Sequence, residues 1–496
     1  MSKEQAFLDY MKKLNHYGQA TALLQWDSRT GLPKKGQGER AEVLGTLSGE
    51  MHKMITSEEV TSLLEAVEND EQVTAITKKS AEQLRRDHDA YKKIPADEFK
   101  AYVMLRSESE AFWEEAKETN NFEGFKPYLE KIVAFKKKMI EYLGYEGHPY
   151  NRLLDDFEPG MTVEKLDPLF EELKQGLIPL IQHVNIAKNK PNTDVLFHHF
   201  PKDKQRELSL AFLDTIGYDF HAGRLDETVH PFATGINRGD VRVTTKYDEH
   251  DFRVALLGTI HEGGHALYEQ NISETLAGTF AGSASSFGIH ESQSLFMEKF
   301  VGQNERFWRA NYPVLQRYAG GTFDDVSFDE FFFALNESKP SFIRIEADEL
   351  TYCLHIIVRY ELEKALFSEE LEVKDLPKAW SEKMKDYFGI VPATDAEGVL
   401  QDVHWPSGMF GYFPSYALGY VYAAQLHERL LVDIPDFEER LETGELEEIR
   451  AWMTEHVHKH GAMKKPDEII RDATGSGVDA KPLLAYLKNK YETLYA

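Results

Sequence analysis

The sequence contains a single cysteine, Cys353, among 496 residues. One cysteine excludes an internal disulfide, a cysteine-rich zinc site and an iron–sulfur cluster. Because Cys353 lies in the apolar run Tyr352 to Val358, we expect a buried, unreactive thiol.

Positive charge is also scarce. Lysine and arginine number 57 against 84 aspartates and glutamates, so the formal net charge is −27 at pH 7 with histidine neutral. A charge of this size and sign repels phosphate backbones and anionic lipid surfaces. We therefore expect neither nucleic acid nor a membrane as a partner.

Long apolar runs are missing as well. The stretch Trp405 to Leu426 has no charged residue and is long enough to suggest a membrane span. However, it contains two prolines, three glycines and four tyrosines, so we expect an internal segment instead. The N-terminal residues are charged and show no apolar signal core, which predicts a cytoplasmic protein.

Apolar residues recur at helical spacing through most of the chain, as at Phe7, Leu8, Met11 and Leu14. The run Asp240 to Thr245 alternates β-branched residues and predicts a strand. With 42% apolar residues, a chain of this length can bury a large core without disulfides. We predict a mostly α-helical fold with a small β-sheet.

No linker or internal repeat divides the chain, so we expect a single unit of residues 1–496. Within it we distinguish a helical N-terminal part of about residues 1–180, a central part of about 225–425 and a helical C-terminal part of about 426–496. In the central part, one helix is predicted to begin near Asp251, which can cap it, and another to run from about His290 to Val301.

The motif His261-Glu262-Gly263-Gly264-His265 carries the chemistry. On a helix, residues i and i+4 share a face, so both imidazoles can bind one zinc ion. Glu262 can then act as the general base on a metal-bound water. Two glycines inside a helix cost stability, which suggests that something must approach the helix backbone closely there.

A catalytic zinc site needs a third protein ligand. Tyr268 and Asn271 stand where the metzincin pattern would require glycine and histidine, which argues against that class. The strongest candidate is Glu291, at the start of the next predicted helix. Three further side chains compete by sequence alone: Glu269, His290 and Glu298. Of these, Glu269 is better suited to orienting a histidine ligand.

Six ordered motifs extend this pattern over nearly the whole chain: His230-Pro231-Phe232, Asp240-Val-Arg242-Val-Thr244, the His-Glu-Gly-Gly-His element, His290-Glu291-Ser292-Gln293, Ile343-Arg344-x-x-Ala347-Asp348 and Gly398-x-x-Gln401-Asp402-x-His404-Trp405. Together they resemble the carboxypeptidase Taq family, also called thermostable carboxypeptidase 1. The early Gln25-Trp26-Asp27 is similar to that family too.

The resemblance implies a metallocarboxypeptidase of broad specificity that releases C-terminal residues one at a time. It implies a saddle-like helical body with a deep substrate groove, similar to neurolysin and angiotensin-converting enzyme, with the small sheet near the active site. It also implies a homodimer, and a Zn2+ cofactor that Co2+ can replace. Residue by residue, it places the metal on His261, His265 and Glu291 and the general base on Glu262.

The substrate's terminal carboxylate is best recognised by an arginine fork. Arg344 and Arg242 lie in the family motifs and are the candidates, each weighed against a structural role such as a pair between Arg344 and Asp348. His230 can hydrogen-bond the substrate backbone or cap a turn. The developing oxyanion needs hydrogen-bond donors. For these we expect His404 and one tyrosine, with Tyr420 and Tyr412 preferred.

The leading hypothesis is therefore a carboxypeptidase that trims peptides, with a zinc-bound water activated by Glu262. The nearest alternative is an oligopeptidase or dipeptidyl carboxypeptidase of the same fold. A third hypothesis is a non-catalytic helical interaction protein with a structural metal site. The presence of Glu262 argues against it, because a structural site does not need that base.

Overall fold

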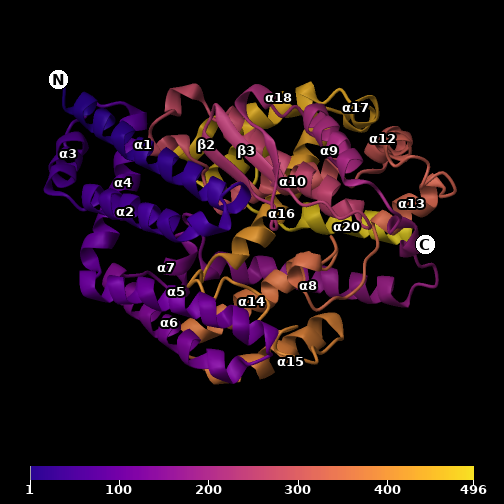
Figure 1. The fold of residues 1–496 in the computed structure, drawn as a ribbon, viewed down its shortest axis with the longest axis horizontal. Coiled ribbons are helices and arrows are strands. Elements are labelled where there is room, and N and C mark those ends of the chain that lie inside the picture. The colour runs from indigo at the N-terminus through magenta and orange to yellow at the C-terminus, as the bar shows by residue number, and fades with distance from the viewer. Residues whose placement is uncertain (1) are drawn as a thin grey trace.

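Amphipathic helices form the N-terminal part of the protein, as the apolar spacing predicts (Figure 1). The computed structural model describes residues 2–496. Helices α1 and α2 lie side by side, and so do α5 and α6. The bounds of this part are α1 Lys3–Thr30, α2 Gln37–Ile55, α3 Glu58–Glu68, α4 Ala75–Lys93, α5 Ala96–Glu118, α6 Phe122–Leu143, α7 Tyr150–Leu154, α8 Val163–Ile186 and α9 Lys202–Ile216.

A three-stranded sheet follows, in the order β1-β3-β2. Its strands are β1 Leu225–Glu227, β2 Ala233–Asn237 and β3 Asp240–Thr245, and β3 coincides with the predicted strand. The central strand β3 pairs parallel to β1 and antiparallel to β2, with Ala233 opposite Val243. The buried face of β3 packs on α10, which places the sheet beside the histidine motif.

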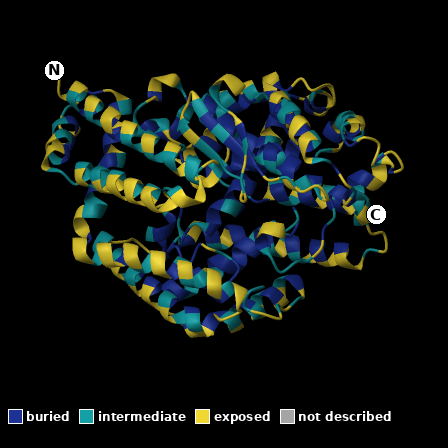
Figure 2. Ribbon diagram, viewed as in Figure 1, coloured by how far each residue is buried: buried dark blue, intermediate teal, exposed yellow. Residues whose placement is uncertain are grey.

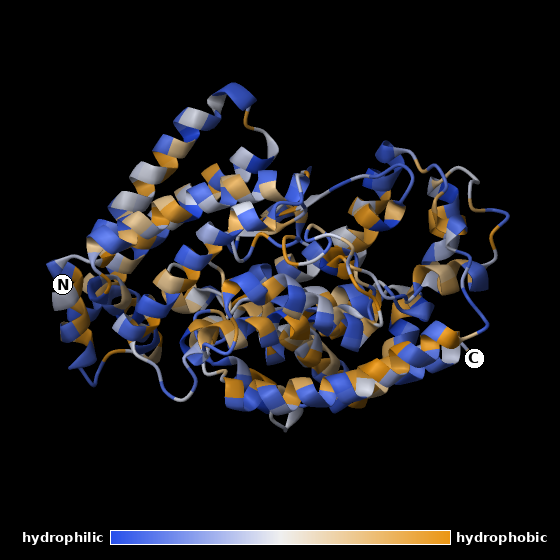
Figure 3. Cartoon of the chain, turned by 90° about the horizontal axis from the view of Figure 1, so that it is seen from below, coloured by the Kyte–Doolittle hydropathy of each residue, from blue (hydrophilic) through white to orange (hydrophobic). Residues whose placement is uncertain are grey.

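The rest of the chain is again helical. Its bounds are α10 Phe252–Asn271, α11 Phe287–Leu295, α12 Glu305–Tyr318, α13 Phe328–Leu335, α14 Tyr352–Phe367, α15 Leu376–Phe388, α16 Phe413–Asp433, α17 Phe437–Thr443, α18 Glu447–His456, α19 Pro466–Thr474 and α20 Lys481–Leu494. The fold is thus mostly α with a small sheet, and this prediction is confirmed. Figure 3 shows apolar and polar residues alternating around many of the outer helices.

The two predicted helix starts agree with the observed starts to within three residues. Asp251 caps α10 by accepting a hydrogen bond from the backbone N–H of Arg253. The next helix begins at Phe287, three residues earlier than expected, because Ser286 caps it. It does not continue as an α-helix to Val301 but changes into a π-helical segment, η6, over Phe296–Val301. Such wide turns are rare and concentrate at functional sites.

The main hydrophobic core runs through the centre of the molecule, and α10, α11, α14 and α16 are its most buried helices (Figure 2). A second, smaller cluster joins α1, α3 and α4 around Phe7, Leu14 and Leu64. Much of the uncharged stretch Trp405 to Leu426 lies inside the core as α16. None of the helices described in residues 2–496 combines the length and the apolar character that crossing a bilayer requires.

Candidate metal centre

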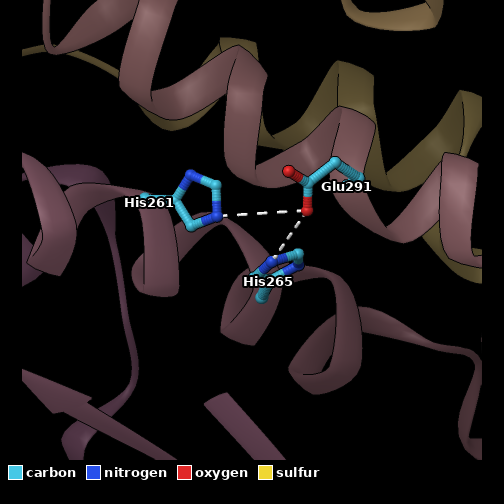
Figure 4. Close-up of side chains that lie close together, drawn as sticks. All are labelled: His261, His265 and Glu291. Atoms are coloured by element: carbon cyan, nitrogen blue, oxygen red, sulfur yellow. Dashed lines mark ion pairs between the residues drawn. The ribbon is translucent and has the colours of Figure 1, made fainter. Parts of the chain in front are cut away.

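The structure brings His261, His265 and Glu291 together (Figure 4). Both histidines project from one face of α10, and Glu291 faces them from α11. One carboxylate oxygen of Glu291 lies 3.4 Å from Nε2 of His265 and 4.0 Å from Nε2 of His261. One donor atom of each side chain falls within 4.8 Å of the others, which is a spacing that a single metal ion can bridge.

Glycines allow the helices that carry these ligands to pack closely. A Cβ atom on Gly264 would lie 2.4 Å from the carbonyl oxygen of Gln293 in α11. A Cβ atom on Gly419 of α16 would lie 2.7 Å from Cβ of Glu291, so α16 also packs closely against α11. The close approach to the helix backbone that the motif predicts is therefore present: the backbone of α11 lies against Gly264, and side chains of α9 lie against Gly263.

The second ring nitrogen of each histidine is held by a partner. Nδ1 of His261 donates to Glu298 at 2.7 Å, and Nδ1 of His265 donates to the backbone carbonyl of His290 at 3.0 Å. These bonds orient Nε2 of both rings toward Glu291. Glu298 therefore lies behind His261 and is not one of the three facing donors. Glu269 does hold a histidine, but this is His290, at 2.9 Å.

The surrounding charges favour a cation at this position. Burial alone would lower the pKa of His261, but Glu298 and Glu291 outweigh it and raise that pKa to about 9. Burial lowers the pKa of His265 to about 4, so that imidazole is neutral and free to act as a ligand. Two imidazole nitrogens, a carboxylate and nearby anionic groups fit a divalent metal.

Glu262 lies beside the ligand set and is almost completely buried, with 8% of its surface exposed. Burial raises its pKa to about 7, against the opposing effect of His261. A carboxyl group with a pKa near neutrality can both accept and return a proton, as general acid–base catalysis requires. The role of Glu262 as the general base stays a prediction, and its burial and raised pKa suit that role.

A cavity of about 1190 Å³ opens onto these residues. Its wall includes Arg344, whose Nε donates to Asp402 at 2.9 Å and whose backbone N–H donates to Gln401. Among residues 2–496 these are the hydrogen bonds that Arg344 donates, and neither uses a terminal guanidinium nitrogen. The considered pair with Asp348 is absent, because Asp348 binds Ser338 and Thr351 instead.

The lining of the same cavity includes His404, Tyr412 and Tyr416. Nε2 of His404 lies 3.3 Å from the Tyr416 hydroxyl. Burial lowers the pKa of His404 to about 3, so its ring is neutral. Burial also raises the pKa of both phenols, which therefore keep their protons and can donate hydrogen bonds at neutral pH.

Tyr420 does not belong to this group, which corrects the expectation from the sequence. It is fully buried, and its hydroxyl donates to Glu349 at 2.6 Å. The four-residue spacing puts Tyr412, Tyr416 and Tyr420 on one side of the chain, but each step moves about 6 Å along a helix. Tyr416, rather than Tyr420, is level with the cavity.

Arg242 and His230 also lie outside the cavity. Arg242 forms a two-pronged pair with Asp240, at 2.7 and 2.8 Å, on the same face of β3. Its guanidinium stacks on Trp26, 4.4 Å from the ring centre, which explains the aromatic residue of the early motif. His230 is exposed, and its neighbours Pro231 and Phe232 line the cavity in its place.

A family model described as carboxypeptidase Taq (M32) metallopeptidase matches residues 6–491 of the chain. This chain belongs to that family. It is 55% identical over 493 residues to carboxypeptidase 1 of Bacillus subtilis, which covers 99% of this chain and 98% of the relative. It is 41% identical to thermostable carboxypeptidase 1 of Thermus thermophilus, with the same coverage.

Solved structures agree with the assignment to the carboxypeptidase Taq family. The M32 carboxypeptidase of Deinococcus radiodurans superposes with a TM-score of 0.97 at 34% identity, covering 99% of both chains. That of Pyrococcus furiosus superposes with a TM-score of 0.95, also at 34% identity and 99% coverage. A metallopeptidase of this family requires a metal ion, and the three facing donor atoms provide a place for it.

Sequence reasoning missed two charged residues near the site of this carboxypeptidase Taq family member. Lys299 lines the cavity and donates a hydrogen bond to Glu298 at 2.6 Å. Burial would raise the pKa of the Glu298 carboxyl, but Lys299 and His261 outweigh it and lower that pKa to about 2. Arg359 is fully buried and binds Asp402. The sequence feature that could have indicated Arg359 is its position as a charged residue directly after the apolar run of α14.

Proposed function

We propose that this protein is a metal-dependent carboxypeptidase that removes C-terminal amino acids one at a time from peptides. One observation carries the proposal: a single cavity contains both the ligand set of His261, His265 and Glu291 and the guanidinium of Arg344. An enzyme that acts only at a chain end must recognise a free carboxylate next to the scissile bond. Arg344 supplies a fixed positive charge for that purpose.

In this mechanism each side chain has one task. A divalent metal, when bound by the three ligands, supplies Lewis-acid chemistry and lowers the pKa of a water molecule. Glu262 accepts the proton of the attacking water and then gives it to the departing amino group. His404 and Tyr416 or Tyr412 donate hydrogen bonds to the oxyanion, and Arg344 holds the terminal carboxylate.

We propose zinc as the metal, with cobalt able to replace it. Two imidazoles and one carboxylate are a common catalytic zinc ligand set, and such a set leaves a further position open. Glu298 and the carbonyl of His290 support this choice, because orienting partners of this kind accompany histidine ligands of zinc.

We also propose one peptidase unit, a homodimer and a cytoplasmic location, as the family resemblance implies. The core that runs through α10, α14 and α16 supports a single unit. On α5, Val103 and Met104 are 49% and 56% exposed, and such apolar side chains suit a contact between copies. Light scattering after size exclusion measures the assembly, and a mass near 57 kDa would contradict the dimer.

The proposed activity is tested by a mass-spectrometric time course on an unblocked peptide of about ten residues and on its C-terminal amide, a length suited to a groove of this size. Zinc or cobalt is added, and a chelator provides the control. We expect a ladder of C-terminal truncations from the free acid only, abolished by the chelator. Internal cuts in both peptides would indicate an oligopeptidase, and no cleavage with either metal would contradict a peptidase.

A further inference from the structure

Behind Arg344 lies a second arginine that the mechanism does not use. Arg359, on α14, is fully buried and all its nitrogens have partners. Nε donates to Asp402 at 2.7 Å, Nη1 to the carbonyl of His355 at 2.7 Å, and Nη2 to Gln401 at 2.7 Å. Its guanidinium also stacks 4.6 Å from the centre of the Trp380 ring. Such an arginine is held rigidly.

Asp402 is shared between the two arginines. Its Oδ1 accepts from Arg344 and its Oδ2 from Arg359. The Gln401 side-chain oxygen is shared in the same way, since it accepts from the backbone N–H of Arg344 and from Nη2 of Arg359. Both carboxylate oxygens of Asp402 are therefore used, and among the guanidinium nitrogens of Arg344 only Nε donates within the cluster.

This buried cluster carries an excess positive charge. Two guanidinium groups face one carboxylate, and the neighbouring His404 is neutral. The net charge of the cluster is therefore +1. The side chains of Arg344 and Asp402 are each only 9% exposed. A buried charge without a counter-ion is costly, so the cluster favours an anion that enters the adjoining cavity.

We propose that Arg359 is a positioning residue for substrate carboxylate recognition. By occupying one oxygen of Asp402, Arg359 prevents a two-pronged pair between Asp402 and Arg344. The positive charge of Arg344 is then available to be neutralised by the terminal carboxylate of a peptide. This inference rests on the proposed carboxypeptidase function and on Arg344 as the contact to the substrate. Arg359 itself does not touch the substrate.

The test compares four forms of the full-length protein loaded with metal: the native chain, Arg359→Met, Asp402→Asn and the double variant. Arg429→Met, at an exposed pair on α16, controls for replacing arginine by methionine. Two quantities are measured: KM for an unblocked peptide, and the inhibition constant of its C-terminal amide. Their ratio reports recognition of the carboxylate. Circular dichroism and metal content monitor folding.

In the native chain we expect the amide to bind at least about tenfold more weakly than the free acid, because a charge-assisted hydrogen bond is lost. Arg359→Met brings the cluster charge to zero. We expect KM for the free acid to rise about 10- to 100-fold, with kcat and the amide constant changed less than about threefold. The control variant keeps native values.

The double variant separates charge from scaffolding. Removing Asp402 together with Arg359 restores a cluster charge of +1, so we expect its KM to return toward the native value. A KM in the double variant as high as in Arg359→Met, or higher, would overturn the proposal. If Arg359→Met does not fold, Arg359→Lys takes its place, since it keeps the charge and should raise KM less than about fivefold. A larger rise in that variant would count against the charge argument.

The result also distinguishes this inference from the proposed function. A native chain that cleaves peptides but binds acid and amide equally would remove the carboxylate contact itself, and with it both proposals. A native chain that discriminates, together with an Arg359→Met variant that discriminates equally well, would overturn only the role of Arg359.

Discussion

At the scale of single residues, Tyr416 and Tyr420 show how position along a helix decides a role. Tyr416 lines the cavity beside His404, whereas Tyr420 is buried against Glu349. We expect Tyr416→Phe to lower kcat by about 100-fold, as the loss of one oxyanion donor does, with little change in melting temperature. Tyr420→Phe should keep kcat and lose about 1–3 kcal/mol of stability. Steady-state kinetics and thermal melts of both variants check this, and the opposite pattern would exchange their roles.

Glu262 is the other decisive single residue. It is buried beside the ligands but is not one of the three facing donors, so it can be replaced without removing a ligand. We expect Glu262→Gln to bind metal as the native chain does and to lose about 10²- to 10⁴-fold in kcat. Metal analysis and peptide hydrolysis measure the two effects. Activity within tenfold of native in a metal-loaded variant would remove Glu262 as the base.

At the scale of elements, the site depends on how closely α10 and α11 pack. We expect Gly264→Ala to lose more than about 2 kcal/mol and to weaken metal binding, because its Cβ meets backbone atoms that cannot move aside. Gly258 lies in the same helix with no atom near its Cβ position, so Gly258→Ala should gain up to about 1 kcal/mol. Denaturant unfolding compares the two. Equal effects would mean that helix propensity, not the contact, decides.

At the scale of the whole molecule, Glu158 joins segments that are far apart in the sequence. Its carboxyl group accepts from Tyr422 on α16 at 2.8 Å and from the backbone N–H of Gly288 in α11 at 3.0 Å. Burial raises its pKa from 4.5 to about 7, although these hydrogen bonds oppose the rise. The folded protein therefore favours the neutral carboxyl, because ionising it would place a buried charge between the helices.

The raised pKa gives the stability a pH dependence. Because the folded protein holds this proton more tightly than the unfolded chain, the stabilisation is complete below about pH 4.5 and is lost as pH rises through about 7. The loss amounts to at most about 3 kcal/mol. In Glu158→Gln the amide oxygen can accept from Gly288 and the amide nitrogen can donate to the Tyr422 hydroxyl oxygen, and the group cannot titrate. Measured by urea unfolding from pH 5 to 8, the native chain should lose stability relative to this variant. A constant difference would contradict the protonated state.

The sequence by itself determined the features that depend on neighbours along the chain. The pair His261 and His265 follows from the pitch of a helix, strand β3 from an alternating pattern, and the close approach at Gly264 from a glycine placed in a helix interior. The sequence also singles out Glu291, which begins the next helix within a recognisable motif, and its role as a ligand stays a prediction. Features of this kind can be inferred because local geometry repeats wherever the pattern occurs.

Only the tertiary structure decided which distant partners meet. Arg344 donates from Nε to Asp402, 58 residues away, and within residues 2–496 its terminal nitrogens have no hydrogen-bond partner, whereas Arg242 pairs with Asp240 two residues away. Sequence spacing suggests no role for Arg359, whereas the fold places it against the same carboxylate. The physical reason is that the role of a charged side chain depends on its counter-ion and on its exposure to solvent, and sequence spacing determines neither of them.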